Sequence, residues 1–192
     1  MKVLNVLPLA TLLFAAPVSA ANAQSIIYHS GMIHAETCAE RVSDPDEHSA
    51  YVLRVCKTAL TDESLSPASR AATLTNTGIM EMRKGDLDTA IAYFRTASAE
   101  DAASPDVAIN LGAALIRVGR FQEAIDALHD PQAISVRHRH IAYYNRAIAH
   151  WAVDDVALAY DDLNAATALK PDYAAARELL QHFQVAEINL DR

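Results

Sequence analysis

Apolar and polar positions along the chain follow one pattern that returns three times. The copies run over residues 76–97, 110–131 and 145–166, and each opens on an asparagine. Within each copy, an early small residue is followed, beyond a short turn, by an alanine and then by a large apolar side chain. Residues four apart share one face of a helix. The pattern therefore predicts a series of two-helix hairpins, and no run of alternating β-branched residues predicts a strand.

The repeated residues also have matching sizes. A small residue, an alanine and a large apolar residue recur in the three copies as Gly78, Ala90 and Phe94, as Gly112, Ala124 and Leu128, and as Ala147, Ala159 and Leu163. Small residues on one helix let its partner approach closely, and the large side chain fills the space beside them. The turns between are "KGD" at 84–86, "VGR" at 118–120 and "VDD" at 153–155. Glycine there supplies a backbone conformation that other residues resist.

These residues, together with Ala97, Ala166 and Pro171, resemble the tetratricopeptide repeat, a helix–turn–helix unit of about 34 residues. The resemblance covers residues 67–172, with copies at about 71–104, 105–139 and 140–172. It implies an all-α fold in which helical hairpins stack into a right-handed solenoid. It also implies a binding scaffold, with the first helix of each copy lining a concave groove.

Two departures from the repeat pattern and one addition are visible. The last helix of the second copy is cut short at "HDPQ", which predicts altered geometry between copies two and three. The first copy has Ala102 where the third has Pro171. After that proline, residues 173–192 predict a C-terminal capping helix, which a stacked array needs to cover its last apolar face.

The first residues have the composition of a secretory signal. Lys2 is followed by a short apolar stretch and by small residues at the spacing of a cleavage site, so residues 1–23 are expected to be removed, with the cut after Ala20 or Ala23. The apolar stretch is too short, and is broken by Pro8, to predict a membrane span. We expect an exported protein, which would be periplasmic in a Gram-negative bacterium.

The N-terminal segment, residues 24–66, holds the two cysteines, Cys38 and Cys56. In an oxidising compartment an even pair predicts a disulfide, and no CxxC spacing favours a redox or metal pair instead. The bridge would tie an irregular stretch, residues 24–47, to a helix at 48–60. That helix resembles the second helix of a degenerate earlier repeat.

Composition and charge narrow the classes of function. The chain has 192 residues, of which 52% are hydrophobic but only 6% aromatic, and its alanine content favours closely packed helices. A net charge of −8 opposes binding to nucleic acid, which needs a basic surface. The sequence contains no Gly-rich phosphate loop, nucleophile elbow or zinc-protease helix. We therefore predict a protein without catalytic activity or cofactor.

The opening asparagines are the first candidates for a binding site. Asn76, Asn110 and Asn145 each lie two residues before the small residue, so stacking would place them in a ladder. The slot is similar to that of the asparagines that hold an extended peptide in the O-linked N-acetylglucosamine transferase superhelix. An amide both donates and accepts, so it can bind the main chain of any sequence. The alternative is that these side chains bond between neighbouring repeats.

Helical spacing from the asparagines gives further candidates for the same groove. They are Ile79, Met82, Arg83, Ile116, Arg117, Tyr144, Ile148 and Trp151. Arg83 and Arg117 could meet an acidic partner or a terminal carboxylate, and the alternative is that they pair with nearby acids or stay solvated. Trp151 is either a contact anchor or part of the packing.

The sequence thus predicts a scaffold that binds a peptide or helix of another protein in the groove. One alternative is a structural protein that self-associates. Another is a metal-responsive regulator that uses the link at 136–140, where His138 and His140 lie, with His150 further on. No carboxylate or cysteine completes a known ligand spacing there.

Overall fold

The computed structural model describes residues 33–101 and 105–190, and in these ranges it contains helices and no strand. The predicted secretory signal, residues 1–23, lies outside the described part of the chain. The helices are α1 (Ile33–Val42), α2 (Ala50–Asp62), α3 (Pro67–Lys84), α4 (Leu87–Glu100), α5 (Val107–Arg117), α6 (Phe121–Ala127), the 3₁₀ helix η2 (Pro131–Ala133), α7 (Arg139–Ala152), α8 (Val156–Leu169) and α9 (Ala174–Leu190).

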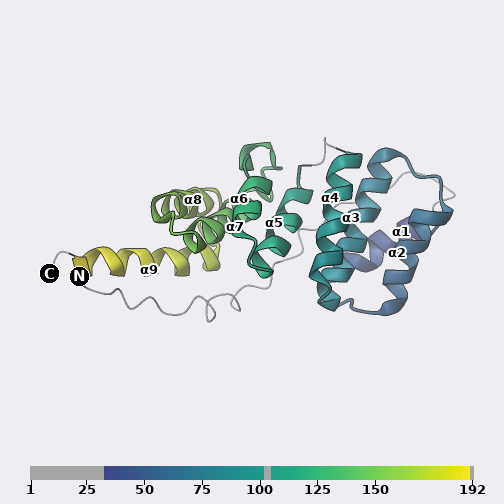
Figure 1. The fold of residues 1–192 in the computed structure, drawn as a ribbon, viewed down its shortest axis with the longest axis horizontal. Coiled ribbons are helices and arrows are strands. Elements are labelled where there is room, and N and C mark those ends of the chain that lie inside the picture. The colour runs from purple at the N-terminus through teal and green to yellow at the C-terminus, as the bar shows by residue number, and fades with distance from the viewer. Residues whose placement is uncertain (1–32, 102–104, 191–192) are drawn as a thin grey trace.

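The helices are arranged as successive hairpins along one long axis (Figure 1). α1 packs with α2, α3 with α4, α5 with α6 and α7 with α8, and α9 packs on α8 at the C-terminal end. The first helices also contact one another, α1 with α3 and α5 with α7. The prediction of an all-α solenoid of helical hairpins is therefore confirmed.

Glycines in two first helices face large side chains of the second helices, as the repeat pattern predicts. Phe94 is fully buried, and a Cβ atom placed on Gly78 would lie 2.6 Å from its Cε1 atom. A Cβ atom placed on Gly112 would lie 2.5 Å from Cδ1 of Leu128. Both distances are well below the carbon–carbon contact distance of about 3.5–4.0 Å. The close approach of the helices therefore requires glycine in these two hairpins.

The turns inside the three hairpins share one backbone geometry. Their middle residues are left-handed, with φ of 94° at Gly85, 76° at Gly119 and 64° at Asp154. In each turn the next amide donates to the carbonyl five residues earlier, at 2.9 Å, in the pairs Asp86 to Glu81, Arg120 to Leu115 and Asp155 to His150. This is the Schellman pattern that ends helices. Glycine in the first two turns was expected, and the third turn places an aspartate in the same conformation.

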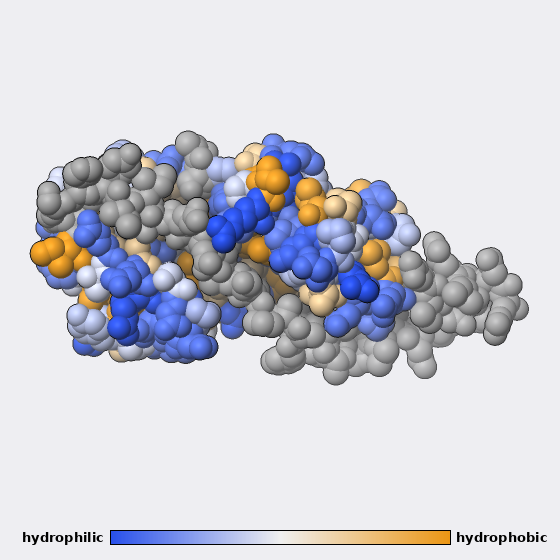
Figure 2. All heavy atoms as spheres, turned by 180° about the vertical axis from the view of Figure 1, so that it is seen from behind, coloured by the Kyte–Doolittle hydropathy of each residue, from blue (hydrophilic) through white to orange (hydrophobic). Residues whose placement is uncertain are grey.

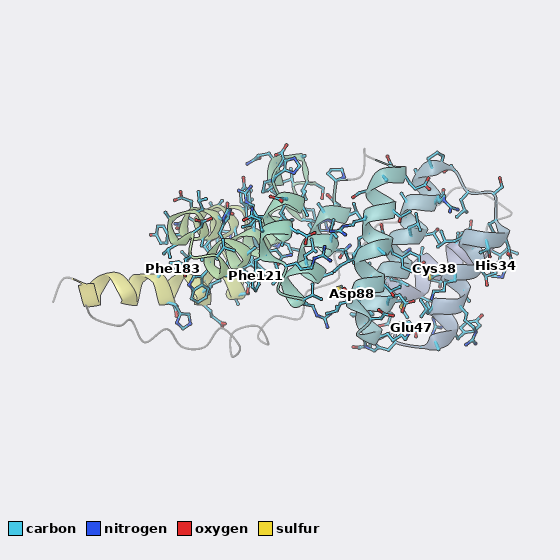
Figure 3. All side chains as sticks on the ribbon, viewed as in Figure 1. His34, Cys38, Glu47, Asp88, Phe121 and Phe183 are labelled. Atoms are coloured by element: carbon cyan, nitrogen blue, oxygen red, sulfur yellow. A yellow bond between two sulfur atoms is a disulfide. The ribbon has the colours of Figure 1, made fainter. Side chains whose placement is uncertain are left out.

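A helix, α1, forms where the sequence predicted an irregular stretch. That prediction, for residues 24–47, is wrong over α1, and residues 24–32 lie outside the described range. The predicted disulfide is present: Cys38 in α1 and Cys56 in α2 are bonded and fully buried, with Cα atoms 4.9 Å apart (Figure 3). When α2 and α4 are aligned on their buried positions, Cys56 stands where Phe94 stands. The bridge therefore replaces the small–large contact of the later hairpins.

Both ends of α1 are held by residues far along the chain. The carboxylate of Glu63 accepts hydrogen bonds from the main-chain N–H groups of His34 (2.7 Å) and Ala35 (3.1 Å). At the other end, the guanidinium of Arg83 donates to the carbonyl of Val42 (3.0 Å). Free N–H and C=O groups at helix ends need such partners. A ten-residue helix, too short to be stable alone, is thereby fixed against α2 and α3.

The second helix of the middle hairpin is short. α6 ends after 7 residues, where α4 and α8 run for 14, so the break predicted at "HDPQ" is confirmed. The buried side chains of Pro131 and Ile134 refill part of the space. Arg146 of α7 donates to the carbonyls of Leu128 (3.3 Å) and His129 (2.9 Å) at the end of α6. These bonds satisfy groups that a longer helix would have paired internally.

α9 covers the last hairpin with one face and presents polar residues on the other. Ala176 and Leu179 are buried against the third hairpin. The exposed side chains are Arg177, Glu178, Gln181 and His182. This is the distribution expected of a capping helix. Within residues 33–101 and 105–190, no helix has both the length and the apolar character needed to span a membrane.

Candidate functional site

The three asparagines that open the repeat copies occupy matching places in the first helices α3, α5 and α7. Their side chains are buried, with exposed fractions of 4% for Asn76, 2% for Asn110 and 4% for Asn145. Each of the three hairpins therefore has one amide beneath its surface. The repeat spacing gives the amides the order of a ladder, and their burial means that they do not line an open surface in this structure.

Two of these amides have polar atoms without hydrogen-bond partners. Among the described residues, Oδ1 of Asn110 and Nδ2 of Asn145 are buried and unpaired. An unpaired buried polar atom costs roughly 1–3 kcal/mol, so such atoms are uncommon in folded interiors. The free atom of Asn110 is an acceptor and that of Asn145 is a donor. These are the two functions that the N–H and C=O groups of a peptide main chain would complement.

The other residues predicted for the groove are placed at three depths. Those that are buried are Ile79, Met82 and Ile116. Those that are half-buried are Arg83, Tyr144, Ile148 and Trp151, and Arg117 is exposed. The helical positions next to the asparagines thus contribute mainly to packing between hairpins. The accessible part of the predicted set lies mainly on α7.

The two arginines of the predicted groove bond to main-chain carbonyls. Besides Val42, Arg83 donates to the carbonyls of Asp44 (3.0 Å) and Glu47 (3.1 Å), and burial lowers the pKa of its guanidinium. Arg117 donates to the carbonyl of Met82 (3.3 Å). Arg83 therefore fastens the connection between α1 and α2 to α3. The alternatives weighed for it, an acidic partner, a nearby acid or solvent, did not include this role.

Aromatic contacts tie the accessible part of α7 to the capping helix. Tyr144 meets Tyr173 edge-on with ring centroids 5.3 Å apart, and Trp151 lies 5.4 Å from the ring of Phe183 (Figure 3). Burial raises the pKa of Tyr144, and burial raises that of Tyr173 to about 12, so both phenols stay protonated. Trp151 therefore takes part in packing against α9, one of the two roles considered for it.

The histidines of the link at 136–140 have separate surroundings. His138 Nδ1 lies 2.9 Å from the carboxylate of Asp106. His140 is buried and meets the ring of Tyr173 edge-on at 5.0 Å, and burial lowers its pKa. His150 Nδ1 is 3.5 Å from the carboxylate of Asp155, too distant for a good hydrogen bond. In the part of the chain that the structure describes, no three His, Cys, Asp or Glu side chains gather to hold a metal ion.

A serine, a histidine and an aspartate meet where this link touches α5. The hydroxyl of Ser135 donates to Asp106 (2.7 Å) and lies 3.1 Å from Nδ1 of His138. Burial raises the pKa of Asp106, but hydrogen bonds from His138 and Ser135 outweigh it and lower the pKa overall. Serine and aspartate share one ring nitrogen, whereas a hydrolytic triad needs them on opposite nitrogens. The cluster therefore anchors the link to α5 and does not form a triad.

Two buried charged groups were missed by the sequence reasoning. Glu81 is 1% exposed in α3 and binds Lys57 of α2 (2.6 Å) and Lys84 (3.3 Å). Arg146 binds the buried Asp162 of α8, and that hydrogen bond raises the pKa of the guanidinium. The available signal was a charged residue inside an otherwise apolar helical stripe. The partners could not be found this way because they lie on other helices.

Comparison with known proteins gives one match. Residues 81–138, from the end of α3 to the link before α7, match the family model described as tetratricopeptide repeat. A search of curated proteins gave no match. The matched segment includes the second helix of one hairpin and both helices of the next, with the glycine contact and the left-handed turns described above. The chain is therefore a tetratricopeptide repeat protein.

Proposed function

We propose that this protein is a non-catalytic scaffold that holds an extended peptide or a helix of another protein against its first helices α3, α5 and α7. Tetratricopeptide repeats generally mediate contacts between proteins. The observation that supports this particular site is the pair of unpaired buried amides at Asn110 and Asn145. An unpaired amide does not stabilise the free fold, and a partner would explain why both are amides.

The two free atoms match a main chain in sign. Oδ1 of Asn110 would accept from a partner N–H group, and Nδ2 of Asn145 would donate to a partner carbonyl. Because both atoms are buried, the partner reaches them only after side chains above them move. Tyr144 and Ile148 are half-buried and flank Asn145 in α7, so they would then contact the partner's side chains. Main-chain bonds would supply affinity, and these side chains would supply selectivity.

We further propose that the protein is exported, and that it is periplasmic if the source is Gram-negative. Residues 1–23 have the composition of a secretory signal. The Cys38–Cys56 bridge suits an oxidising compartment, where disulfides persist. Intact-mass analysis of protein recovered from the envelope fraction tests this. A mature chain that begins at Ala21 or Gln24 agrees with export, and an uncut chain recovered from the cytosol contradicts it.

Affinity capture with matched variants tests the binding site. Tagged wild-type protein, an Asn110→Ala/Asn145→Ala variant and an Asn164→Ala control are incubated with envelope extract, and bound proteins are identified by mass spectrometry. Asn164 is exposed on α8 and its amide donates locally to the carbonyl of Tyr160. The proposal predicts one partner that is retained by the control and lost by the double variant. Equal capture by all three would contradict it, provided that circular dichroism shows equal helicity.

A further inference from the structure

Exposed apolar side chains are concentrated on one helix. Within the described ranges, seven large apolar residues are exposed, and four of them belong to α8: Val156 (50%), Leu158 (50%), Tyr160 (36%) and Leu169 (41%). Seen from behind, the surface is mostly polar with separate apolar patches (Figure 2). A surface helix normally buries its apolar stripe and exposes polar residues. α8 therefore carries more exposed apolar surface than its place in the fold requires.

Leu158 and Leu169 lie on the side of α8 that faces the end of α6. Helical spacing puts both on the same side as Asp162, at four and seven residues from it. Asp162 binds Nε and Nη2 of Arg146 at 2.8 and 2.7 Å. The same guanidinium reaches the end of α6 through the carbonyl of His129 (2.9 Å). The chain of contacts therefore places the two leucines beside the point where α6 stops.

The corresponding space between the first two hairpins is bridged by charge. Arg95 of α4 and Glu123 of α6 form an ion pair at 2.6 Å. By repeat position, Leu158 of α8 corresponds to Glu123, and His129 corresponds to Arg95. No such ion pair can therefore form between α6 and α8. Because α6 has half the length of α4, the side of α8 next to it is left uncovered.

The hollow of the first hairpin shows how the apolar character is specific to α8. A cavity of about 550 Å³ lies along α4, and its lining includes Thr89 and Thr96. At the same positions α8 has Leu158 and Ala165. Hydroxyl groups that suit contact with water are thus replaced by a leucine and an alanine. The small side chain of Ala165, between the two leucines, allows another helix to approach closely.

Carboxylates surround this side of α8. Asp161 follows it on α8, and Asp126 and Asp130 lie at the end of α6, all three exposed. Arg146 lies between the two helices, but its charge is matched by Asp162. The whole chain carries a net charge of −8. Two acidic copies would repel each other here, whereas a basic partner would be attracted.

We propose that Leu158, Ala165 and Leu169 form a docking face for an amphipathic helix of a partner protein, with its apolar stripe on the leucines and its basic residues toward Asp126 and Asp161. The leucines are separated by three helical turns, roughly 16 Å, which fits a rod-shaped partner with apolar residues every three to four positions. This face is separate from the asparagines, so the inference does not depend on the proposed groove.

Fluorescence anisotropy with a labelled 14-residue amphipathic Leu/Lys peptide tests the proposal. The wild-type chain should bind this probe, and a Leu158→Ser/Leu169→Ser variant should bind it at least tenfold more weakly. A Val156→Ser/Tyr51→Ser variant is the matched control, because it removes two equally exposed apolar side chains elsewhere and should change the Kd less than twofold. An Asp126→Lys/Asp161→Lys variant should also weaken binding, most strongly at low salt.

Three outcomes would overturn the proposal. The first is no binding of the probe to the wild-type chain. The second is equal weakening by the control, which would mean that a basic peptide binds the acidic surface without a defined site. The third is a dimer, seen in sedimentation, that disappears in the Leu158→Ser/Leu169→Ser variant, which would mean that a second copy covers this face. Circular dichroism establishes that each variant keeps its helicity, since all substituted side chains are exposed.

Discussion

Arg146 and Asp162 form a two-point ion pair that joins α7 to α8 at 2.8 and 2.7 Å. The side chain of Asp162 is 7% exposed and that of Arg146 is 19% exposed. The same guanidinium accounts for the carbonyls at the end of the shortened α6 and lies 5.6 Å from the ring centre of Tyr143. One residue therefore stabilises the only described hairpin whose second helix is cut to half length.

Replacing Arg146 with methionine should lower the free energy of unfolding by about 3 kcal/mol, because it leaves the carboxylate of Asp162 buried without a partner. Urea unfolding followed by circular dichroism measures this change. Arg137→Met is the control, since Arg137 is exposed in the link, and its effect should stay within about 0.5 kcal/mol. Equal stabilities of the two variants would contradict the role given to Arg146.

The contact between Gly78 and Phe94 should respond to substitution as a pair. Gly78→Ala should destabilise the protein by roughly 1–3 kcal/mol, because its new Cβ atom would overlap the phenyl ring. Adding Phe94→Leu reproduces the alanine–leucine combination that the third hairpin has at Ala147 and Leu163. The double variant should therefore be more stable than the sum of the two single changes predicts. Strictly additive effects in thermal unfolding would show that the two residues are not coupled.

The left-handed turns predict opposite effects at two equivalent positions. Asp154→Gly should stabilise the protein by about 0.5–1 kcal/mol, because glycine adopts a positive φ without steric cost. Gly119→Ala should destabilise it by about 1 kcal/mol for the same reason. Nothing lies within 4 Å of a Cβ atom placed on Gly119, so the effect reports backbone conformation alone. A loss of stability in Asp154→Gly would indicate that the aspartate carboxylate contributes more than the backbone strain costs.

Glu47 should make stability depend on pH below neutrality. Hydrogen bonds from the side chain and main-chain N–H of Ser49, with a further contribution from Arg41, lower the pKa of Glu47 from 4.5 to about 2. A lowered pKa contributes stability that is present above pH 4.5 and is lost as the pH falls toward 2. Glu47→Gln should therefore have a lower Tm than wild type near pH 6, with the difference shrinking toward pH 2. The exposed Glu36→Gln serves as the control and should show no such trend.

The sequence predicted the hairpins because their determinants are local. Glycine, alanine and large apolar residues recur at fixed helical spacing, and the contacts they make, such as Gly112 with Leu128, lie within one copy. The helix α1 was not predicted because what holds it is distant. Glu63 and Arg83 bond its ends, and Cys56 ties it to α2. A short helix stabilised from outside leaves a weak pattern in its own residues.

The candidate site was predicted in position but not in depth. Repeat spacing put Asn110 and Asn145 in matching places on successive first helices, as observed. Spacing alone does not say how far neighbouring hairpins close over a side chain, and both amides are buried. The roles of Arg83 and Trp151 also depend on α1 and α9, which lie outside the three copies. Contacts with such flanking elements cannot be read from the repeat.

The most direct test of the central claim is the free energy of unfolding of the Asn110→Ala/Asn145→Ala variant in urea. The claim is that these amides serve a partner and not the fold. Removing two unpaired polar atoms should offset the lost packing, so the variant should stay within about 1 kcal/mol of wild type. Thr75→Ala/Thr77→Ala provides the comparison, because both hydroxyls are buried and bonded. A loss of more than about 3 kcal/mol in the asparagine variant would show that the amides hold the fold, which contradicts the claim.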